Sequence, residues 1–126
     1  MLYTVRGLVE GSGGVTIRVR VVAKEQPRVV KTKDGAEHVV VDSRVGDRTG
    51  MIQLALWDNL THEVETGDII DIENGYVSRF KGYLFLNVGK YGRVEKVEEP
   101  GFPSVEEIVA RSGQRGHRRR SFLNKP

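Results

Sequence analysis

Cysteine is absent from this 126-residue chain, which excludes disulfide bonds and thiolate metal sites. The three histidines, His38, His62 and His117, lie too far apart in sequence to match a metal-ligand motif. Long apolar runs are also absent, and the amino terminus lacks the features of a secretory signal. We therefore expect a cytoplasmic protein with no metal, no cofactor and no membrane partner. No Ser-His-Asp or paired-carboxylate pattern stands at recognisable spacing, so we do not expect an enzyme.

Acidic residues are missing from the last part of the chain. Residues 111–126 contain six Lys or Arg and no Asp or Glu, whereas residues 1–110 contain 14 Lys or Arg against 17 Asp or Glu, a net charge of −3. Residues 111–126 are predicted to be a disordered basic tail, which either adds non-specific affinity for a polyanion or only improves solubility. Because the remaining body is acidic, a polyanion-binding face on it must gather its cations locally.

Alternation of apolar and polar residues predicts five strands. The segment TIRVRVVA predicts the first, with Arg18 and Arg20 on its solvent side. Pro27 interrupts before RVVK resumes, so this strand is expected to continue after a bend. An Asp-Gly pair at residues 34–35 predicts a hairpin into HVVVDSRV, where Val39 is in phase with the buried valines. The remaining strands are predicted in MIQLALW, DIIDIENGYV and YLFLNV.

Five short strands with one longer connection, between the third and the fourth, predict an all-β protein. A five-stranded Greek-key barrel of the OB-fold type satisfies this order, although an SH3-like barrel or a small sandwich has a similar strand count. Ser104 and Glu107 form a capping-box pattern ahead of a short helix. The predicted domains are a flexible lead-in at 1–14, an OB-fold domain at 15–99, a short helix at 100–110 and the disordered basic tail at 111–126.

Aromatic residues make up only 7% of the chain, and the single tryptophan stands where alternation predicts a solvent-facing side chain. In MIQLALW, Ile52, Leu54 and Leu56 point to the interior, which leaves Trp57 outward at the end of the strand. An exposed indole calls for a binding partner. The alternative is that Trp57 packs beneath the loop at residues 58–67.

A second aromatic group occurs in GYVSRFKG, where Tyr76 and Phe80 stand beside Arg79 and Lys81. Flat rings next to cations suit the stacking of nucleic-acid bases while phosphates are neutralised. Either ring could instead close the end of the barrel. Phe85 faces outward by alternation in YLFLNV, where it either contacts bases or covers the tail or the short helix.

Several cations are candidates for phosphate contact. Lys31 and Lys33 flank the Asp-Gly turn, where they either close over a nucleic-acid strand or only solubilise the hairpin. Arg28 and Arg44 project from the first and second predicted strands. Arg79 and Lys81 are favoured more strongly because they share a loop with Phe80. The full set is Arg28, Lys31, Lys33, Arg44, Arg79 and Lys81.

The segments VVKTKDGAEHVVVDSRVGDRTGMIQLALWDN and TGDIIDIENGYVSRFKGYLFLNVG resemble the single-OB-fold single-stranded DNA-binding proteins of archaea. The chain is similar also to the simple single-stranded DNA-binding proteins of animal cells. The resemblance covers residues 16–97, with GFP at 101–103 as a further likeness, and its most specific pieces are GD-x-TG, LW-D and F-K-G.

This resemblance implies that Trp57, Tyr76 and Phe80 stack on bases, because an aromatic residue stands at each matching position. Some relatives carry a further aromatic where this chain has Asn87, and neighbouring Phe85 is the candidate to replace it. The tail of the family often ends in an acidic partner-binding segment, whereas this chain ends basic, so that feature is not expected here.

The expected function is single-stranded DNA binding with little sequence preference, by base stacking and phosphate neutralisation, in DNA replication, repair or recombination. RNA binding through the same rings is an alternative, because stacking does not distinguish the sugar. A second alternative is a protein–protein assembly module whose exposed aromatics are interface anchors. We expect a nucleoid-associated monomer, with replication or repair proteins as further partners.

Overall fold

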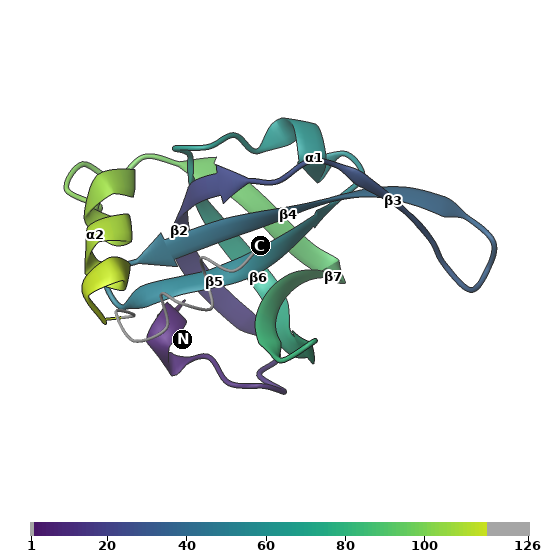
Figure 1. The fold of residues 1–126 in the computed structure, drawn as a ribbon, viewed down its shortest axis with the longest axis horizontal. Helices are drawn as coiled ribbons and strands as arrows, with labels where there is room; N and C mark the ends of the chain where they lie inside the picture. The colour runs from purple at the N-terminus through teal and green to yellow at the C-terminus, as the bar shows by residue number, and fades with distance from the viewer. Residues whose placement is uncertain (1, 116–126) are drawn as a thin grey trace.

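The computed structural model describes residues 2–115. In this part of the chain a single sheet, in the order β1-β2-β6-β7-β5-β4-β3, closes into a barrel because β2 also pairs with β4 (Figure 1). The strands are β1 (Leu2–Tyr3), β2 (Val15–Lys24), β3 (Arg28–Lys31), β4 (Glu37–Asp47), β5 (Gly50–Trp57), β6 (Ile69–Phe80) and β7 (Tyr83–Val97). The helices are the 3-10 helix η1 (Val5–Gly7), α1 (Leu60–Glu63) and α2 (Val105–Arg115).

The closed ring consists of the five long strands β2, β6, β7, β5 and β4. Neighbours in this ring are antiparallel except β5 and β7, which are parallel. Helix α1 lies in the connection between β5 and β6, which is the long connection that the sequence predicts between the third and fourth strands. The predicted five-stranded barrel is confirmed, and β1 and β3 are short additions to it.

Inward-facing apolar side chains fill the barrel, as the alternation of apolar and polar residues predicts. Along β2 the residues Val15, Ile17, Val19 and Val21 are fully buried, and on β5 the same holds for Leu54. Because side chains of a strand alternate between two faces, this inward set forces the residues between them onto the outer face. The outer face of β4, β5, β6 and β7 is therefore available for other contacts.

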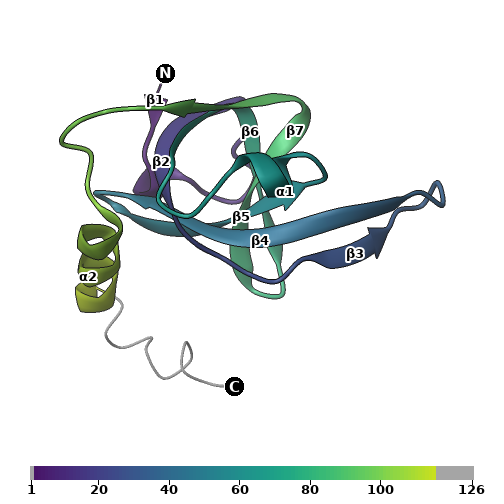
Figure 2. The same ribbon diagram turned by 90° about the horizontal axis from the view of Figure 1, so that it is seen from above.

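Strands β3 and β4 continue past the barrel as a hairpin arm, on the side opposite α2 (Figure 2). Its turn has Gly35 at φ +87, where a side chain would be strained, and Asp34 accepts hydrogen bonds from the Thr32 hydroxyl and the Ala36 amide. The Thr32 hydroxyl is the main cause of a lowered pKa at Asp34. The prediction that Val39 is buried is wrong: it is 39% exposed because the arm leaves the core.

The segment expected as a flexible lead-in is packed against the barrel. Val5 and Leu8 belong to the hydrophobic core. The Val5 amide donates to Asp47 Oδ2 at 3.0 Å, and backbone hydrogen bonds join Gly11 and Ser12 to Val77. The apolar side chains and these hydrogen bonds hold the segment on the barrel. The sequence does not predict this order, because a two-residue strand and a single helical turn are too short to show a periodic pattern.

Helix α2 begins at the predicted capping box: the Ser104 amide donates to Glu107 Oε1 at 2.8 Å and the Glu107 amide donates to Ser104 Oγ at 3.1 Å. The helix is longer than expected and ends at Arg115, so residues 111–115 are helical and the prediction of a disordered tail from 111 is wrong for them. The rest of that prediction, 116–126, lies outside the described residues. Ile108 is buried against the barrel.

Arg18 and Arg20, which the sequence predicts to face solvent, are both tied to the connection between β7 and α2. Arg18 binds Asp71 through two nitrogens and Glu99 through a third, and these acceptors raise its pKa. Arg20 donates to the carbonyl oxygens of Pro103 and Gly67. Alternation correctly predicts that both side chains lie on the outer face of β2. The connection between β7 and α2 covers this face, however, and orders both side chains.

Candidate nucleic-acid interface

The register of the sheet brings the predicted aromatic residues onto one outer face. Residues opposite each other in neighbouring strands point to the same side. Phe85 on β7 lies opposite Gln53 of β5 and Ser78 of β6, and Asn87 lies opposite Ala55 and Tyr76. The side chains that share this face by register include Trp57, Ala55 and Gln53 of β5, Tyr76, Ser78 and Phe80 of β6, and Tyr83, Phe85 and Asn87 of β7.

The three predicted rings of β5 and β6 are open to water. Trp57 is 37% exposed, Tyr76 47% and Phe80 58%, so their predicted outward placement is confirmed. Phe85 is half-buried and packs edge-on against Phe80, with ring centroids 6.2 Å apart. Side chains of this size are costly to leave in water, and a flat partner that covers them is favourable. Contact with nucleic acid stays a prediction for all four.

Trp57 is held at the junction of the barrel and the hairpin arm. It lies opposite Val40 of β4 in the register, and the His38 ring packs against it at 5.5 Å with an interplanar angle of 64°. His38 Nδ1 is in turn 2.8 Å from Asp58 Oδ2. The indole is therefore exposed but braced, contrary to the alternative in which it is covered by the following loop.

Asp58 completes this junction from the residue after Trp57. It adopts φ +53, a conformation that Asp tolerates, and its Oδ1 accepts a hydrogen bond from the Val39 amide at 3.1 Å. The pKa of Asp58 is lowered, first by the hydrogen bond to His38 and then by the Val39 amide. His38 is a member of the site that was not predicted, although it is in phase with the outward residues Asp42 and Arg44 of β4.

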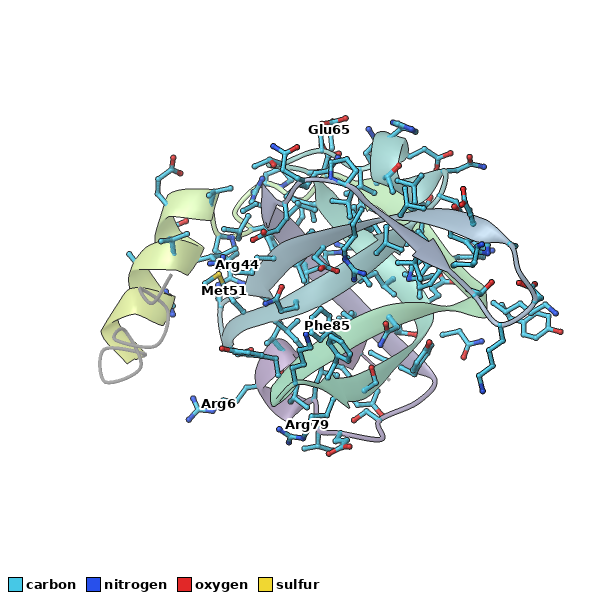
Figure 3. The ribbon with its side chains drawn as sticks, turned by 45° about the vertical axis from the view of Figure 1, so that its right-hand side comes forward. Arg6, Arg44, Met51, Glu65, Arg79 and Phe85 are labelled. Atoms are coloured by element: carbon cyan, nitrogen blue, oxygen red, sulfur yellow. The ribbon has the colours of Figure 1, made fainter. Side chains whose placement is uncertain are left out.

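The two cations near Phe80 point in different directions. Lys81, in the β6–β7 turn at φ +53, places its Nζ 5.4 Å from the centroid of the Phe80 ring. Arg79 lies on the other side of the ribbon, because it alternates with Phe80, and it is paired with Glu10 at 2.9 Å. In Figure 3 it lies away from Phe85, toward the amino-terminal segment. The structure groups Lys81 with the rings and separates Arg79 from them.

Arg28 and Arg44 share the aromatic face by register. Arg28 lies opposite Val40, next to Trp57, and is 3.2 Å from Asp42. Arg44 lies opposite Gln53 and is 4.0 Å from Glu25. Figure 3 shows Arg44 toward α2, so the two arginines stand at opposite ends of the face.

Lys31 and Lys33 are exposed near the tip of the hairpin arm, Lys31 opposite Glu37 and Lys33 within the turn. The arm that carries them projects from the barrel (Figure 2). Their participation depends on the arm approaching a bound strand.

Asn87 lies opposite Tyr76 and two residues after Phe85 on the same face. Its Nδ2 donates to Ser78 Oγ at 3.0 Å and to the Phe85 carbonyl oxygen at 3.1 Å. The small side chain of Ala55 lies opposite on β5. Asn87 is thus fixed in the face without supplying a ring.

Comparison with known proteins agrees with this geometry. Residues 8–96 match the family model for single-stranded DNA binding protein Ssb-like OB folds. The chain belongs to this Ssb-like OB-fold family. It is 33% identical over 94 residues to the single-stranded DNA binding protein Ssb of Saccharolobus solfataricus, a match that covers 75% of this chain and 63% of that relative.

Solved structures from replication protein A are also similar. The second OB-fold domain of replication protein A from Methanococcus maripaludis has a TM-score of 0.65 and 29% identity, and the match covers 79% of this chain and 97% of that domain. A replication protein A heterotrimer bound to single-stranded DNA matches with a TM-score of 0.65 at 16% identity, over 82% of this chain and 26% of that one, which shows a shared fold alone. Among residues 2–115, no helix has the length and apolar character needed to cross a bilayer.

Proposed function

We propose that this Ssb-like chain binds single-stranded DNA with little sequence preference and without catalysis, in DNA replication, repair or recombination. The observation that carries the proposal is the alignment of Trp57, Tyr76, Phe80 and Phe85 on one outer face of the barrel, with three of the rings well exposed. Every base has a flat face, so an aromatic row of this kind accepts bases without reading their edges.

The free energy of base stacking is large enough to support binding of single-stranded DNA. Stacking is worth about 1–3 kcal/mol per base, so three rings contribute roughly 3–9 kcal/mol before the cost of ordering the strand. Phe85, which packs edge-on against Phe80, serves in this proposal to brace that ring and to extend its surface. In duplex DNA the base faces are already stacked, so we expect much weaker binding of a duplex.

Phosphate neutralisation in this proposal comes from cations close to the rings. Lys81 lies beside Phe80, and Arg28 and Arg44 lie on the same face. The pairs of Arg28 with Asp42 and of Arg44 with Glu25 are at the surface, where an ion pair is worth only about 0–1 kcal/mol, so exchange of the carboxylate for a phosphate costs little. Lys31 and Lys33 would add contacts if the arm moves toward the strand.

The direct test uses the only tryptophan in the chain as the reporter. Addition of oligo(dT) to the full chain should quench Trp57 fluorescence in a saturable way, because a stacked base alters the environment of the indole. A duplex of equal length should quench far less. Absence of quenching at any oligo(dT) concentration, with direct measurement of bound labelled oligo(dT) also negative, would refute the proposed function.

A competition experiment separates DNA from RNA as the preferred ligand. Unlabelled oligo(U) is titrated against a labelled oligo(dT) complex. If stacking alone determines affinity, oligo(U) should displace the labelled oligo(dT) about as well as unlabelled oligo(dT) does. A clear preference for either strand would require a contact to the sugar or to the thymine methyl group.

A further inference from the structure

The pair formed by His38 and Asp58 lies at the edge of the Trp57 ring, and base stacking makes no use of it. His38 shares the face of Val40 and Trp57 by alternation along β4. Its ring packs against the indole at 5.5 Å, and its side chain remains 31% exposed. A strand that covers Trp57 must therefore pass close to this imidazole.

Asp58 determines which nitrogen of His38 carries the proton. The lowered pKa of Asp58 keeps its carboxyl group ionised, and an ionised carboxylate only accepts hydrogen bonds. Nδ1, 2.8 Å from Asp58 Oδ2, must therefore carry a hydrogen. In the neutral ring Nε2 is then an acceptor, and among the described residues it has no hydrogen-bond partner.

We infer that His38 is a proton-linked phosphate contact at the edge of the Trp57 ring: protonation of Nε2 converts an acceptor into a charged donor for a phosphate oxygen of the bound strand. This inference rests on the proposed function. Neutral His38 presents a lone pair toward an anionic backbone, which is unfavourable, whereas the imidazolium presents a positive N–H. Binding of single-stranded DNA should therefore take up a proton and tighten as the pH falls.

The groups around His38 are compatible with this change of charge. On β3 the residue opposite is the apolar Val30, and the hairpin turn contributes Asp34, whose carboxylate interacts favourably with a charged His38. Glu37, the preceding residue on β4, lies opposite Lys31. From the end of β5 the facing groups are Trp57 and Asp58. Arg28, two positions along the face, is paired with Asp42.

The test measures oligo(dT) affinity of the full chain between pH 8 and pH 5.5, a range in which thymine does not titrate. Affinity of the natural chain should rise about fivefold or more toward pH 5.5, and His38→Gln should remove most of this rise. His62→Gln, a change in an exposed histidine of α1, is the matched control and should retain it. Equal pH profiles in the natural chain and His38→Gln would overturn the inference while leaving the proposed function intact.

Salt dependence distinguishes a phosphate contact from a contact to a base. Each phosphate contact on a single strand steepens the slope of log affinity against log salt by about 0.7. The natural chain should show a slope steeper by about that amount at pH 5.5 than at pH 8, and His38→Gln should show none of this difference. A pH effect that depends on His38 but leaves the slope unchanged would overturn the assignment to phosphate.

A measurement on the natural chain makes the outcome independent of folding in the variant. Nitrogen-15 NMR of the His38 imidazole should show hydrogen on Nδ1 in the neutral free protein. Addition of oligo(dT) should move the titration midpoint of this ring to higher pH, since the bound state favours the proton. A neutral ring with hydrogen on Nε2, or a midpoint that does not move upward, would contradict the inference. If oligo(dT) does not bind at all, the proposed function fails instead.

Discussion

At the scale of single residues, the exposed rings lie outside the hydrophobic core. Trp57, Tyr76 and Phe80 leave between 37% and 58% of their surfaces in water, while the interior is filled by aliphatic residues such as Leu54 and Ile17. Removal of one of these rings should therefore cost less stability than removal of a core side chain, which allows its contribution to binding to be measured.

Trp57→Ala should weaken oligo(dT) binding about tenfold or more, because loss of one stacked base removes about 1–3 kcal/mol and 1.4 kcal/mol corresponds to tenfold. The variant lacks the tryptophan, so the dissociation constant is measured by the anisotropy of a labelled oligonucleotide. Phe102→Ala is the control, since Phe102 packs under Arg20, away from the aromatic face. The affinity of this variant for oligo(dT) should match that of the natural chain. An unchanged constant in Trp57→Ala would remove this ring from the site.

Asn87→Tyr should strengthen oligo(dT) binding several-fold. Asn87 lies on the aromatic face opposite Tyr76 and the small Ala55, so a ring there adds a stacking surface. The lost hydrogen bond to Ser78 offsets part of the gain. Asn87→Ala serves as control, because it removes the amide without adding a ring and should not tighten binding. Equal affinities of the tyrosine and alanine variants would show that no base reaches this position.

At the scale of elements, strands were predictable where alternation extends over many residues. In β2 and β5 the inward aliphatic residues alone determine the outer face, and hence the placement of Trp57. The amino-terminal segment was not predictable, since Val5 is fixed by Asp47, 42 residues away. Likewise, alternation predicts that Arg18 points outward, but it does not predict that the connection between β7 and α2 covers this side chain. The His38–Asp58 pair was missed for the same reason: it joins residues that only the β4–β5 register brings together.

The docking of α2 on the barrel depends on a glycine, which allows a test at this scale. A Cβ on Gly46 would lie 2.6 Å from Ile108 Cγ2 and 2.8 Å from the Gly50 carbonyl oxygen. Gly46→Ala should therefore destabilise the protein by about 1–3 kcal/mol, because a branched side chain and a backbone atom must both shift. Gly13→Ala, with nothing within 4 Å, should leave the urea midpoint unchanged. Equal midpoints for the two variants would mean that α2 does not pack on Gly46 in solution.

At the scale of the whole molecule, charge is distributed unevenly. Residues 1–110 carry a net charge of −3, whereas 116–126 contain Arg118, Arg119, Arg120 and Lys125 and no acid. Long-range attraction of DNA by the body is therefore weak, and the rings and nearby cations act only at short range. The basic end of the chain is the part able to attract phosphates from a distance.

Truncation after Arg115, where α2 ends, tests this division without cutting the helix. For a single strand, removal of one cation that neutralises a phosphate makes the slope of log affinity against log salt shallower by about 0.7, so removal of the four cations should change the slope by up to roughly 3. Affinity should fall most at low salt, where electrostatic attraction is strongest, and quenching of Trp57 at saturation should be unchanged because the rings remain.

Oligo(dT) titrations of both chains over a range of salt concentrations give the two slopes. Equal slopes would mean that residues 116–126 bind no phosphate, and the body alone would then supply the whole electrostatic part of binding.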